Sequence, residues 1–359
     1  MLAEILSAHW PAYVAKFGRL IPAEQHAAVR AILRCRTPAL GGQRYRCACG
    51  REHFAYHSCN HRACPRCGQA DAAQWLARQR TRLLPVPYFL VTFTVPEQLR
   101  EPIRAAMKPW YGALLKAGSA ALQDLAAQPK HLGAELGLTA MLQTWTRDLR
   151  YHPHVHVLVP GGGLTPNGLR WVRVTDAEFL LPQVKLAARF KGRLKEWLQT
   201  QAPELFQPVP EQVWWLKWVA DIQPVGSGEA ALKYLAAYLC RPPLHESQLD
   251  RWDAQSVTFC YRENGGQQRC CTVSSEEFVR RFLQHVPPRG LQRVRHYGWL
   301  GAAAKAKRER ILALLDWQPP AVVKPAPVPP PKCPCCGKPM LLLGTLPRAP
   351  TGTRWTMNV

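Results

Sequence analysis

Long apolar runs are absent from this sequence. The longest, residues 88–95 and 340–343, fall far short of the roughly 20 residues that a membrane-spanning helix needs. The first residues show no basic segment followed by an apolar stretch, so we expect no secretory signal. No glycine-rich phosphate-binding loop appears, which argues against chemistry driven by a bound nucleotide. We therefore expect neither a membrane protein, nor a secreted protein, nor a P-loop enzyme.

Acidic side chains are also scarce. Only 24 Asp and Glu residues stand against 47 Lys and Arg residues, which gives a formal net charge of +23. A positive field of this size favours a polyanionic partner, with nucleic acid ahead of an anionic membrane surface. Hydrophobic residues make up 47% of the chain, so a globular protein is expected rather than a disordered one. A chain of 359 residues is long enough for two or three units.

The sequence does contain thirteen cysteines, and six of them lie in one segment. Residues 35–67, CRTPALGGQRYRCACGREHFAYHSCNHRACPRC, also hold three histidines and end in Cys64-Pro-Arg-Cys67. Close thiol pairs of this kind are typical of a structural zinc site, where the ion substitutes for part of a hydrophobic core. A cytoplasmic protein keeps its thiols reduced, so we expect metal rather than disulfides.

The choice of zinc ligands stays open at this point. The candidates, with the first choice leading and Cys59 as a close alternate, are Cys47, Cys49, Cys64, Cys67, Cys59, and then Cys35 or His53. Cys47 and Cys49 are separated by one residue rather than two, which makes it harder for both thiolates to bind the same ion. Cys59 therefore stays a candidate. Nearby arginines, Arg62 and Arg66 among them, could contact DNA or lie in solvent.

Two histidines at the centre of the chain form the next pattern. Residues 141–164 read MLQTWTRDLRYHPHVHVLVPGGGL, and the apolar residues around His154 and His156 predict a buried β-strand. Strand side chains repeat every two residues, so both imidazoles lie on one face and could bind a metal together. Two ordinary buried histidines are the alternative. Strands are also expected over residues 88–95, 138–145 and 213–222, the second pairing antiparallel with the histidine strand.

A helix downstream carries two tyrosines. In GSGEAALKYLAAYLCRPP, residues 226–243, Tyr234 and Tyr238 stand four positions apart, so both phenols project from one helix face. Lys233 and Arg241 lie close by in sequence. Such a pair is usually a packing feature, but a phenolate can also attack phosphorus and form a phosphodiester with a DNA end. A cation bound by the histidine pair could polarise that phosphate. The bond energy is kept in the adduct, so resealing needs no ATP.

The last hundred residues combine basic, aromatic and cysteine patterns. A hairpin is expected from residues 256–262 and 268–273, and Ser274 with Glu277 forms a helix-capping box. The segment RGLQRVRHYGWL that follows interleaves aromatic residues with phosphate-contacting candidates, namely Arg289, Arg293, Arg295 and His296. Residues 318–332 form a proline-rich linker. Cys333-Pro-Cys335-Cys336 resembles half a zinc knuckle, whose other ligands would come from elsewhere in the fold or from a second chain.

Taken together, these motifs resemble the rolling-circle transposases of the HUH endonuclease superfamily, of the two-tyrosine, insertion-sequence-91 type. The resemblance rests on CRTPALGG, SCNHRACPRC, LLPVPYFLVTFTVP, YHPHVHVLVPGGGL, YLAAYLCRPP and SSEEFVRRFLQHVPPRGLQRVRHYGWL, and it covers most of the chain. It implies an α+β fold with a central antiparallel sheet, flanking helices and an N-terminal zinc-binding domain. The expected units are residues 1–84 (helical and zinc-binding), 85–245 (nuclease core), 246–317 (basic DNA-binding part) and 318–359 (linker and cysteine-rich tail).

The resemblance also implies roles for single residues. His154 and His156 would hold Mg²⁺ or Mn²⁺, and Tyr234 and Tyr238 would attack single-stranded DNA at the ends of an insertion element. A third metal ligand is unassigned, with Glu229 and Gln143 as candidates. The partners would be transposon-end and target DNA, in the cytoplasm and at the nucleoid. A plasmid or phage replication initiator or relaxase stays an alternative, and so does a non-catalytic zinc-dependent nucleic-acid-binding regulator.

Overall fold

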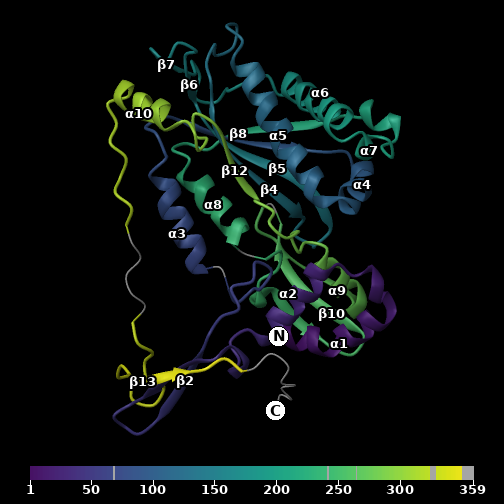
Figure 1. Cartoon of the computed structure of the whole chain (residues 1–359), viewed down its shortest axis with the longest axis vertical. Coiled ribbons are helices and arrows are strands. Elements are labelled where there is room, and N and C mark those ends of the chain that lie inside the picture. Colours follow the sequence, from purple (N-terminus) through teal and green to yellow (C-terminus); the bar gives the residue numbers. More distant parts are fainter. Residues whose placement is uncertain (68, 241, 264, 324–328, 350–359) are drawn as a thin grey trace.

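The computed structural model describes residues 1–67, 69–240, 242–263, 265–323 and 329–349, and only the backbone of residues 69, 70 and 238–240. Its helices and strands form an α+β fold with antiparallel sheets, as the sequence predicts. Figure 1 shows a large sheet with helices in the upper part, a smaller unit of helices and strands below it, and a separate small sheet at the lower left.

Five strands form the central sheet, and every neighbouring pair is antiparallel. Their order is β12 (Val294–Gly298), β4 (Gly137–Trp145), β5 (Tyr151–Pro160), β3 (Tyr88–Thr94) and β8 (Val219–Pro224). The expected strands β3, β4 and the histidine strand β5 are confirmed, and β4 pairs with β5 as predicted. Strand β12 is unexpected, because its alternation of basic and aromatic residues resembles an exposed binding surface.

The strand expected over residues 213–222 is wrong in its first half. Trp214 ends a short 3₁₀ helix, η4 (Glu211–Trp214), and β8 begins only at Val219. The rings of Trp214 and Trp218 stack with centroids 5.7 Å apart, and the Trp218 indole N–H donates to the Val213 carbonyl. Residues four apart in a strand are separated by roughly 13 Å. Stacking of the two buried indoles therefore requires a turn.

Helices cover both faces of the central sheet (Figure 1). On one face lie α4 (Arg100–Ala105), α5 (Met107–Ala126) and α6 (Gln183–Gln201). Buried residues cover more than half of the surface of α5, because this helix packs against the sheet on one side and against α6 on another. On the other face, α8 (Glu229–Cys240) packs against α3 (Gln69–Arg80). The histidine face of β5 is the face that α8 covers.

A second hydrophobic core joins the start of the chain to residues far downstream. Its elements are α1 (Leu2–Phe17), α2 (Ala23–Arg34), β9 (Leu249–Trp252), β10 (Ser256–Arg262), β11 (Gln268–Ser274) and α9 (Ser275–Leu283). The predicted hairpin is confirmed as β10 and β11, and the Ser274 hydroxyl caps α9 by accepting from the Glu277 N–H. The division of the chain into four units stays a prediction, since the N-terminal helices share their core with residues 244–286.

The turn between β4 and β5 connects this second core to the central sheet. Leu149 is fully buried in the second core, and it adopts a left-handed backbone with φ of 63°. Its carbonyl accepts a hydrogen bond from the Gln284 amide, and the His285 ring lies 3.1 Å away from the same oxygen. The two cores are therefore held against each other at the end of the histidine strand.

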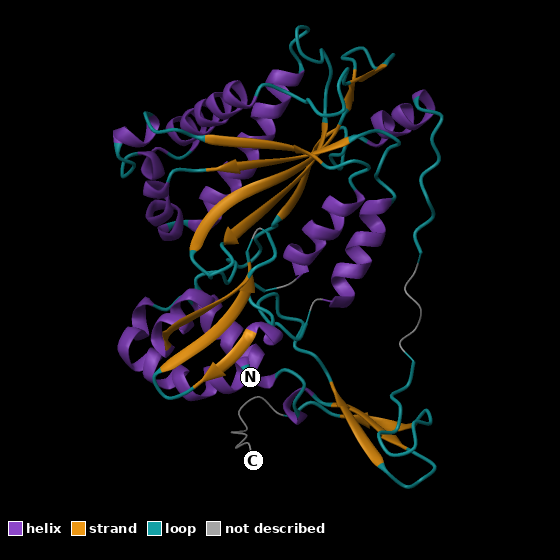
Figure 2. Ribbon diagram, turned by 180° about the vertical axis from the view of Figure 1, so that it is seen from behind, coloured by secondary structure: helices purple, strands orange, loops and turns teal. Residues whose placement is uncertain are grey.

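The third sheet is formed by both ends of the chain. Strands β1 (Gly42–Arg46) and β2 (Glu52–Tyr56) form a hairpin, and β13 (Leu341–Leu346) pairs with β1, so this unit is called the terminal sheet below. Figure 2 shows it apart from the other two sheets. The remaining elements are α7 (Pro203–Phe206), α10 (Lys305–Leu314), β6 (Gly162–Leu164), β7 (Trp171–Arg173), η1 (Gly18–Leu20), η2 (Pro38–Leu40), η3 (Glu97–Leu99) and η5 (Glu246–Gln248). Of the helices described, none is long and apolar enough to span a membrane.

Candidate active site and cysteine clusters

His154 and His156 point to the same face of β5, as the two-residue period requires. Their ring centroids lie 4.8 Å apart, with the rings nearly perpendicular. Both side chains are buried: 8% of His154 and 6% of His156 remain exposed. The apolar residues between and after them, Val155 and Val157, face the opposite core under α5. The strand thus places both imidazoles on the face that α8 covers. Its valines pack into the core on the opposite face and hold the strand in place.

Neighbouring groups fix the orientation of both rings. Nδ1 of His154 lies 2.6 Å from the His152 carbonyl oxygen, so Nδ1–H donates there and Nε2 keeps its lone pair. Nδ1 of His156 lies 3.0 Å from the Thr92 hydroxyl, and its Nε2 lies 3.1 Å from Oε1 of Gln143. Contacts of this kind to the second ring nitrogen commonly orient histidine ligands.

Burial also keeps both imidazoles neutral. It lowers the pKa of His156 to about 4, and burial together with the neighbouring His156 lowers the pKa of His154 to about 3. Neutral imidazole is the form that binds a metal. At neutral pH the pair is therefore in its metal-binding protonation state.

The two candidates for a third ligand have different surroundings. Gln143 lies on β4 directly beside the pair, and its amide oxygen is 3.1 Å from His156. Glu229 is instead held by Arg80 of α3 at 2.6 Å and by Lys233 at 3.4 Å. In the described parts of the chain, no carboxylate joins the histidines in a cluster of potential ligands. The donor set that fits a divalent cation here is two imidazoles and one amide oxygen.

Tyr234 of α8 faces the histidine pair. Its ring lies perpendicular to that of His156, with centroids 5.8 Å apart, and 40% of the side chain is exposed. A helix residue that contacts the sheet while keeping much of its surface in solvent is accessible to a ligand. Tyr238 follows one turn later on α8, but its side chain lies outside the described residues, as does Arg241 entirely.

An open cleft of about 860 Å³ runs past these residues. Gln143, His154 and Tyr234 line it, together with four residues that the sequence analysis missed: His152, Arg147, Arg150 and Arg262. The same two-residue period that pairs His154 with His156 would have identified His152, whose ring centroid lies 5.0 Å from that of His154. The arginines come from the turn after β4 and the end of β10, which the sequence alone does not bring together.

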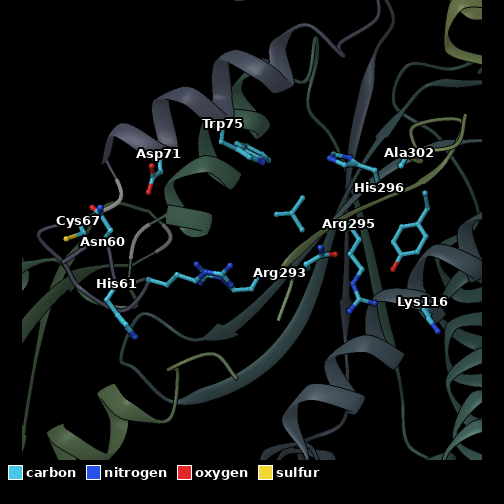
Figure 3. Close-up of a pocket in the computed structure, with 14 residues that line it drawn as sticks. Asn60, His61, Cys67, Asp71, Trp75, Lys116, Arg293, Arg295, His296 and Ala302 are labelled. Atoms are coloured by element: carbon cyan, nitrogen blue, oxygen red, sulfur yellow. The ribbon is translucent and has the colours of Figure 1, made fainter. Parts of the chain in front are cut away.

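A second groove, of about 680 Å³, gathers predicted DNA-binding residues (Figure 3). Arg62, Arg293, Arg295 and His296 all line it, and the Arg62 guanidinium donates to the Leu291 carbonyl. Trp75 of α3 and Lys116 of α5 complete the wall. Figure 3 shows that three separate parts of the chain meet here: the cysteine segment, α3 and β12.

The other predicted DNA-binding residues lie elsewhere. Arg66 is paired with Glu246, Lys233 is paired with Glu229, and Arg289 is exposed on a loop outside both grooves. Within the groove, burial lowers the pKa of His296 to about 4, so this ring is neutral and can only hydrogen-bond. The positive charge of the groove comes from its arginines and Lys116.

The cysteines form two clusters, and the first-choice zinc site is wrong. A buried cluster consists of Cys35, Cys59, Cys64 and Cys67, and a composite cluster consists of Cys47, Cys49, Cys333 and Cys336. Within each cluster all four sulfur atoms lie within 4.8 Å of one another. Cys47 and Cys49 follow β1 into the terminal sheet, whereas Cys64 and Cys67 pack in the second core. The two pairs therefore cannot share one ion.

Other cysteine predictions are also corrected. His53 is exposed on β2 and belongs to neither cluster, whereas Cys35, only a possible ligand from sequence, is fully buried among the first four. The chain also has a disulfide, Cys260–Cys270, across β10 and β11. Both clusters fit Zn²⁺, which prefers four thiolates in a closed tetrahedral site. In the buried cluster, hydrogen bonding from Cys64 lowers the pKa of Cys59 to about 5, which favours the thiolate.

Comparison with known proteins places these sites in a family. Residues 137–308 match a family described as "Putative transposase", and residues 5–95 match the "Transposase zinc-binding domain" of insertion-sequence-91 elements. The first match contains the histidine strand, α8 and β12, and the second contains the whole buried cluster. No solved structure matches the chain significantly.

Two curated proteins are similar over most of their length. "Putative transposase y4qJ" of Sinorhizobium fredii is 36% identical over 320 residues, which are 84% of this chain and 80% of that protein. "Transposase for insertion sequence element IS801" of Pseudomonas savastanoi pv. phaseolicola is 28% identical over 295 residues, 76% of this chain and 69% of that one. Both names favour a transposase over a replication initiator or a non-catalytic regulator. The chain belongs to the insertion-sequence-91 type family of transposases.

Proposed function

We propose that this transposase nicks and rejoins single-stranded DNA at the ends of its insertion element, with Tyr234 as a nucleophile. The observation that carries the proposal is the contact between Tyr234 and His156 in an open cleft. A tyrosine that is merely a packing residue would not need to be 40% exposed beside two neutral, oriented imidazoles. A purely DNA-binding protein would need neither group.

The proposed reaction is a pair of transesterifications. The Tyr234 oxygen attacks the scissile phosphorus, a phosphotyrosine bond forms, and the DNA oxygen leaves as a free hydroxyl at the other end. A divalent cation, Mg²⁺ or Mn²⁺, held by His154 and His156 with Gln143, would polarise the phosphate and stabilise its charge. In the reverse step a DNA hydroxyl attacks the phosphotyrosine and releases the phenol. One phosphodiester is exchanged for another, so no nucleotide is consumed.

The remaining groups of the cleft would position the DNA. Arg147, Arg150 and Arg262 line the same cleft and can contact phosphates on either side of the scissile bond. Tyr238 follows Tyr234 by one turn of α8 and would supply a second nucleophile for a second strand. Two adducts in one chain would allow the cut and the joined strands to be held together during transfer.

The basic groove is proposed as a second DNA-contacting surface. Arg62, Arg293, Arg295 and Lys116 provide phosphate contacts, and Trp75 and Tyr297 are aromatic surfaces for bases. Arg66, Lys233 and Arg289, which lie outside this groove, would contact DNA only beyond it, and Arg241, directly after α8 in sequence, would also contact DNA. A protein with these roles would work in the cytoplasm at the nucleoid.

The test is covalent capture of DNA. Full-length protein is incubated with Mn²⁺ or Mg²⁺ and a labelled single-stranded oligonucleotide that carries its own element end, and the denaturation-resistant adduct is measured on a gel. We expect Tyr234→Phe to reduce the adduct by at least about 100-fold. Tyr261→Phe is the matched control, because Tyr261 lines the same cleft from β10 but has no proposed role. An adduct at the wild-type level in a Tyr234→Phe/Tyr238→Phe protein would disprove the nucleophile assignment.

A second variant separates cation binding from DNA binding. His154→Ala should lower adduct formation about 100-fold or more while the affinity for the same oligonucleotide stays within about twofold, because the imidazole serves the cation. Equal losses of affinity and adduct would show that the histidines serve the structure instead.

A further inference from the structure

The composite cluster extends beyond the segment that matches the zinc-binding domain. Cys47 and Cys49 lie within residues 5–95, but Cys333 and Cys336 belong to the other end of the chain. We propose that these four thiolates bind a second structural zinc ion, which fastens the C-terminal tail to the N-terminal hairpin. The transposase would then hold two zinc ions per chain. This inference does not depend on the proposed nicking reaction.

The sulfur positions fit a tetrahedral ion. Sγ of Cys47 lies 3.3 Å from that of Cys336, and Sγ of Cys49 lies 3.6 Å from that of Cys333. Zinc–sulfur bonds of about 2.3 Å give a tetrahedron with edges of about 3.8 Å. A disulfide needs sulfur atoms about 2.05 Å apart, so these pairs are too widely spaced to be disulfides. A site of four thiolates selects zinc over magnesium or calcium.

The backbone makes a similar turn on both sides of the cluster, one residue shorter at Cys47 than at Cys333. The Cys47 N–H donates to the Arg51 carbonyl, and the Gly50 N–H donates back to the Cys47 carbonyl. On the other side, the Cys333 N–H donates to the Lys338 carbonyl, and the Gly337 N–H donates to the Cys333 carbonyl. Each turn ends in a glycine with positive φ, 87° at Gly50 and 70° at Gly337, which a residue with a side chain adopts only with strain.

Backbone N–H groups are also directed at two of the sulfur atoms. The N–H groups of Cys335 and Cys336 both point to Cys333, and the N–H of Cys49 points to Cys47. The shorter spacing of Cys47 and Cys49 is therefore accommodated by a turn that is one residue shorter than its partner.

In the part of the chain that the structure describes, the terminal sheet has a very small hydrophobic core. Its buried core consists of Cys47, Cys333 and Met340, with Tyr45 packed against them. On β13, residues 341–345 are all exposed, so the pairing of β13 with β1 gains little from apolar burial. A unit with so small a core usually needs a metal or disulfides to fold. The two cysteine pairs meet beside the end of β1 and the beginning of β13.

Cys335 provides an internal control. It lies between two proposed ligands, is exposed, and does not belong to the cluster. Replacement of Cys335 changes the local sequence of the turn as much as replacement of Cys336, but it removes no ligand. Any effect specific to the metal should therefore distinguish the two positions.

The experiment is a zinc count on purified full-length protein by native mass spectrometry, with elemental analysis of the same sample. We expect two zinc ions per chain in the wild type and in Cys335→Ser, and one in Cys333→Ser/Cys336→Ser. A single zinc ion in the wild type, or two ions retained in the double variant, would overturn the proposal.

A second measurement guards against a fold defect in the double variant. Trypsin should cut after Lys332 at least about tenfold faster in the Cys333→Ser/Cys336→Ser protein than in Cys335→Ser, because the tail is released from β1. The Cys47→Ser/Cys49→Ser protein should show the same faster cleavage, since it removes the ligands from the other side. Equal cleavage rates in these three proteins would refute the role of the ion in fastening the tail.

Discussion

The two cysteine clusters use the same four-thiol chemistry in different surroundings. In the buried cluster, Cys35 and Cys64 are at most 1% exposed and pack in the second core with side chains such as Phe278. In the composite cluster, Cys49 and Cys336 are exposed, and only a minimal core supports the sheet. Metal binding and apolar burial therefore stabilise the same unit in the first case. In the second case the metal acts almost alone.

The difference also concerns attachment. The unit of the buried cluster contacts the central sheet through buried groups, with His285 between Leu149 and Thr144. In the described residues, the terminal sheet has a hydrophobic cluster of its own, apart from the other cores. Damage at the buried cluster should consequently spread into the fold, whereas damage at the composite cluster should stay local. The predictions below test that contrast.

The largest effect is expected at the buried cluster. Cys64→Ser should lower the free energy of unfolding by about 4 kcal/mol or more, because it removes a zinc ligand and places a hydroxyl in an apolar core. The change is measured by urea unfolding monitored by circular dichroism. The control is Cys271→Ser, a free cysteine at the edge of the same core that belongs to neither cluster. Similar losses in the two variants would remove the distinction between a ligand and a packing cysteine.

The next effect concerns the buried contact between the cores. Burial lowers the pKa of His285 to about 4, against about 6.5 in an unfolded chain, so between these values the unfolded state binds more protons. The stabilising contribution is complete above pH 6.5 and is lost as the pH falls through 4. The expected loss is about 3 kcal/mol.

Unfolding of the wild type and His285→Gln at a series of pH values measures this contribution. The variant should lose about 3 kcal/mol less between pH 6.5 and 4, because it has no imidazole to protonate. Zinc release in acid occurs in both proteins and cancels in the difference. If the free energy of unfolding changed with pH in the same way in both proteins, protonation of His285 would not contribute to the acid sensitivity of the fold.

The smallest effect is kinetic. A chelator should remove zinc from the composite cluster at least about tenfold faster than from the buried cluster, because exposed sulfur atoms can be attacked without opening a core. A metal-sensitive dye follows the release, and the Cys333→Ser/Cys336→Ser protein should lack the fast phase. Loss of the slow phase in that variant would reverse the predicted order.

Much of the candidate site was predictable because its signals are local. Period-two alternation predicts β4 and β5 and puts His154 and His156 on one face, and helical spacing predicts α8 with its tyrosines. The contact of Tyr234 with His156 is not a local property. It depends on α8 crossing the sheet against α3, which the apolar residues of both elements decide.

The remaining errors have a common cause. Trp214 and Trp218 suit a strand by composition, but their stacking in the core makes a turn. Strand β12 lacks an apolar pattern and forms because β4 offers it an edge. Propensity describes what a segment prefers in isolation, and packing with distant partners overrides it in these two places.

The sequence by itself determined the chemistry that the chain carries: two histidines two residues apart, two tyrosines one helical turn apart, a positive charge and closely spaced thiols. Only the tertiary structure decided which of these groups meet. Cys49 and Cys333 are 284 positions apart and yet their sulfur atoms are 3.6 Å apart, while Cys49 and Cys64, near in sequence, belong to different clusters. Ligand geometry is a property of distances in space, and strand pairing between the two ends of the chain sets those distances.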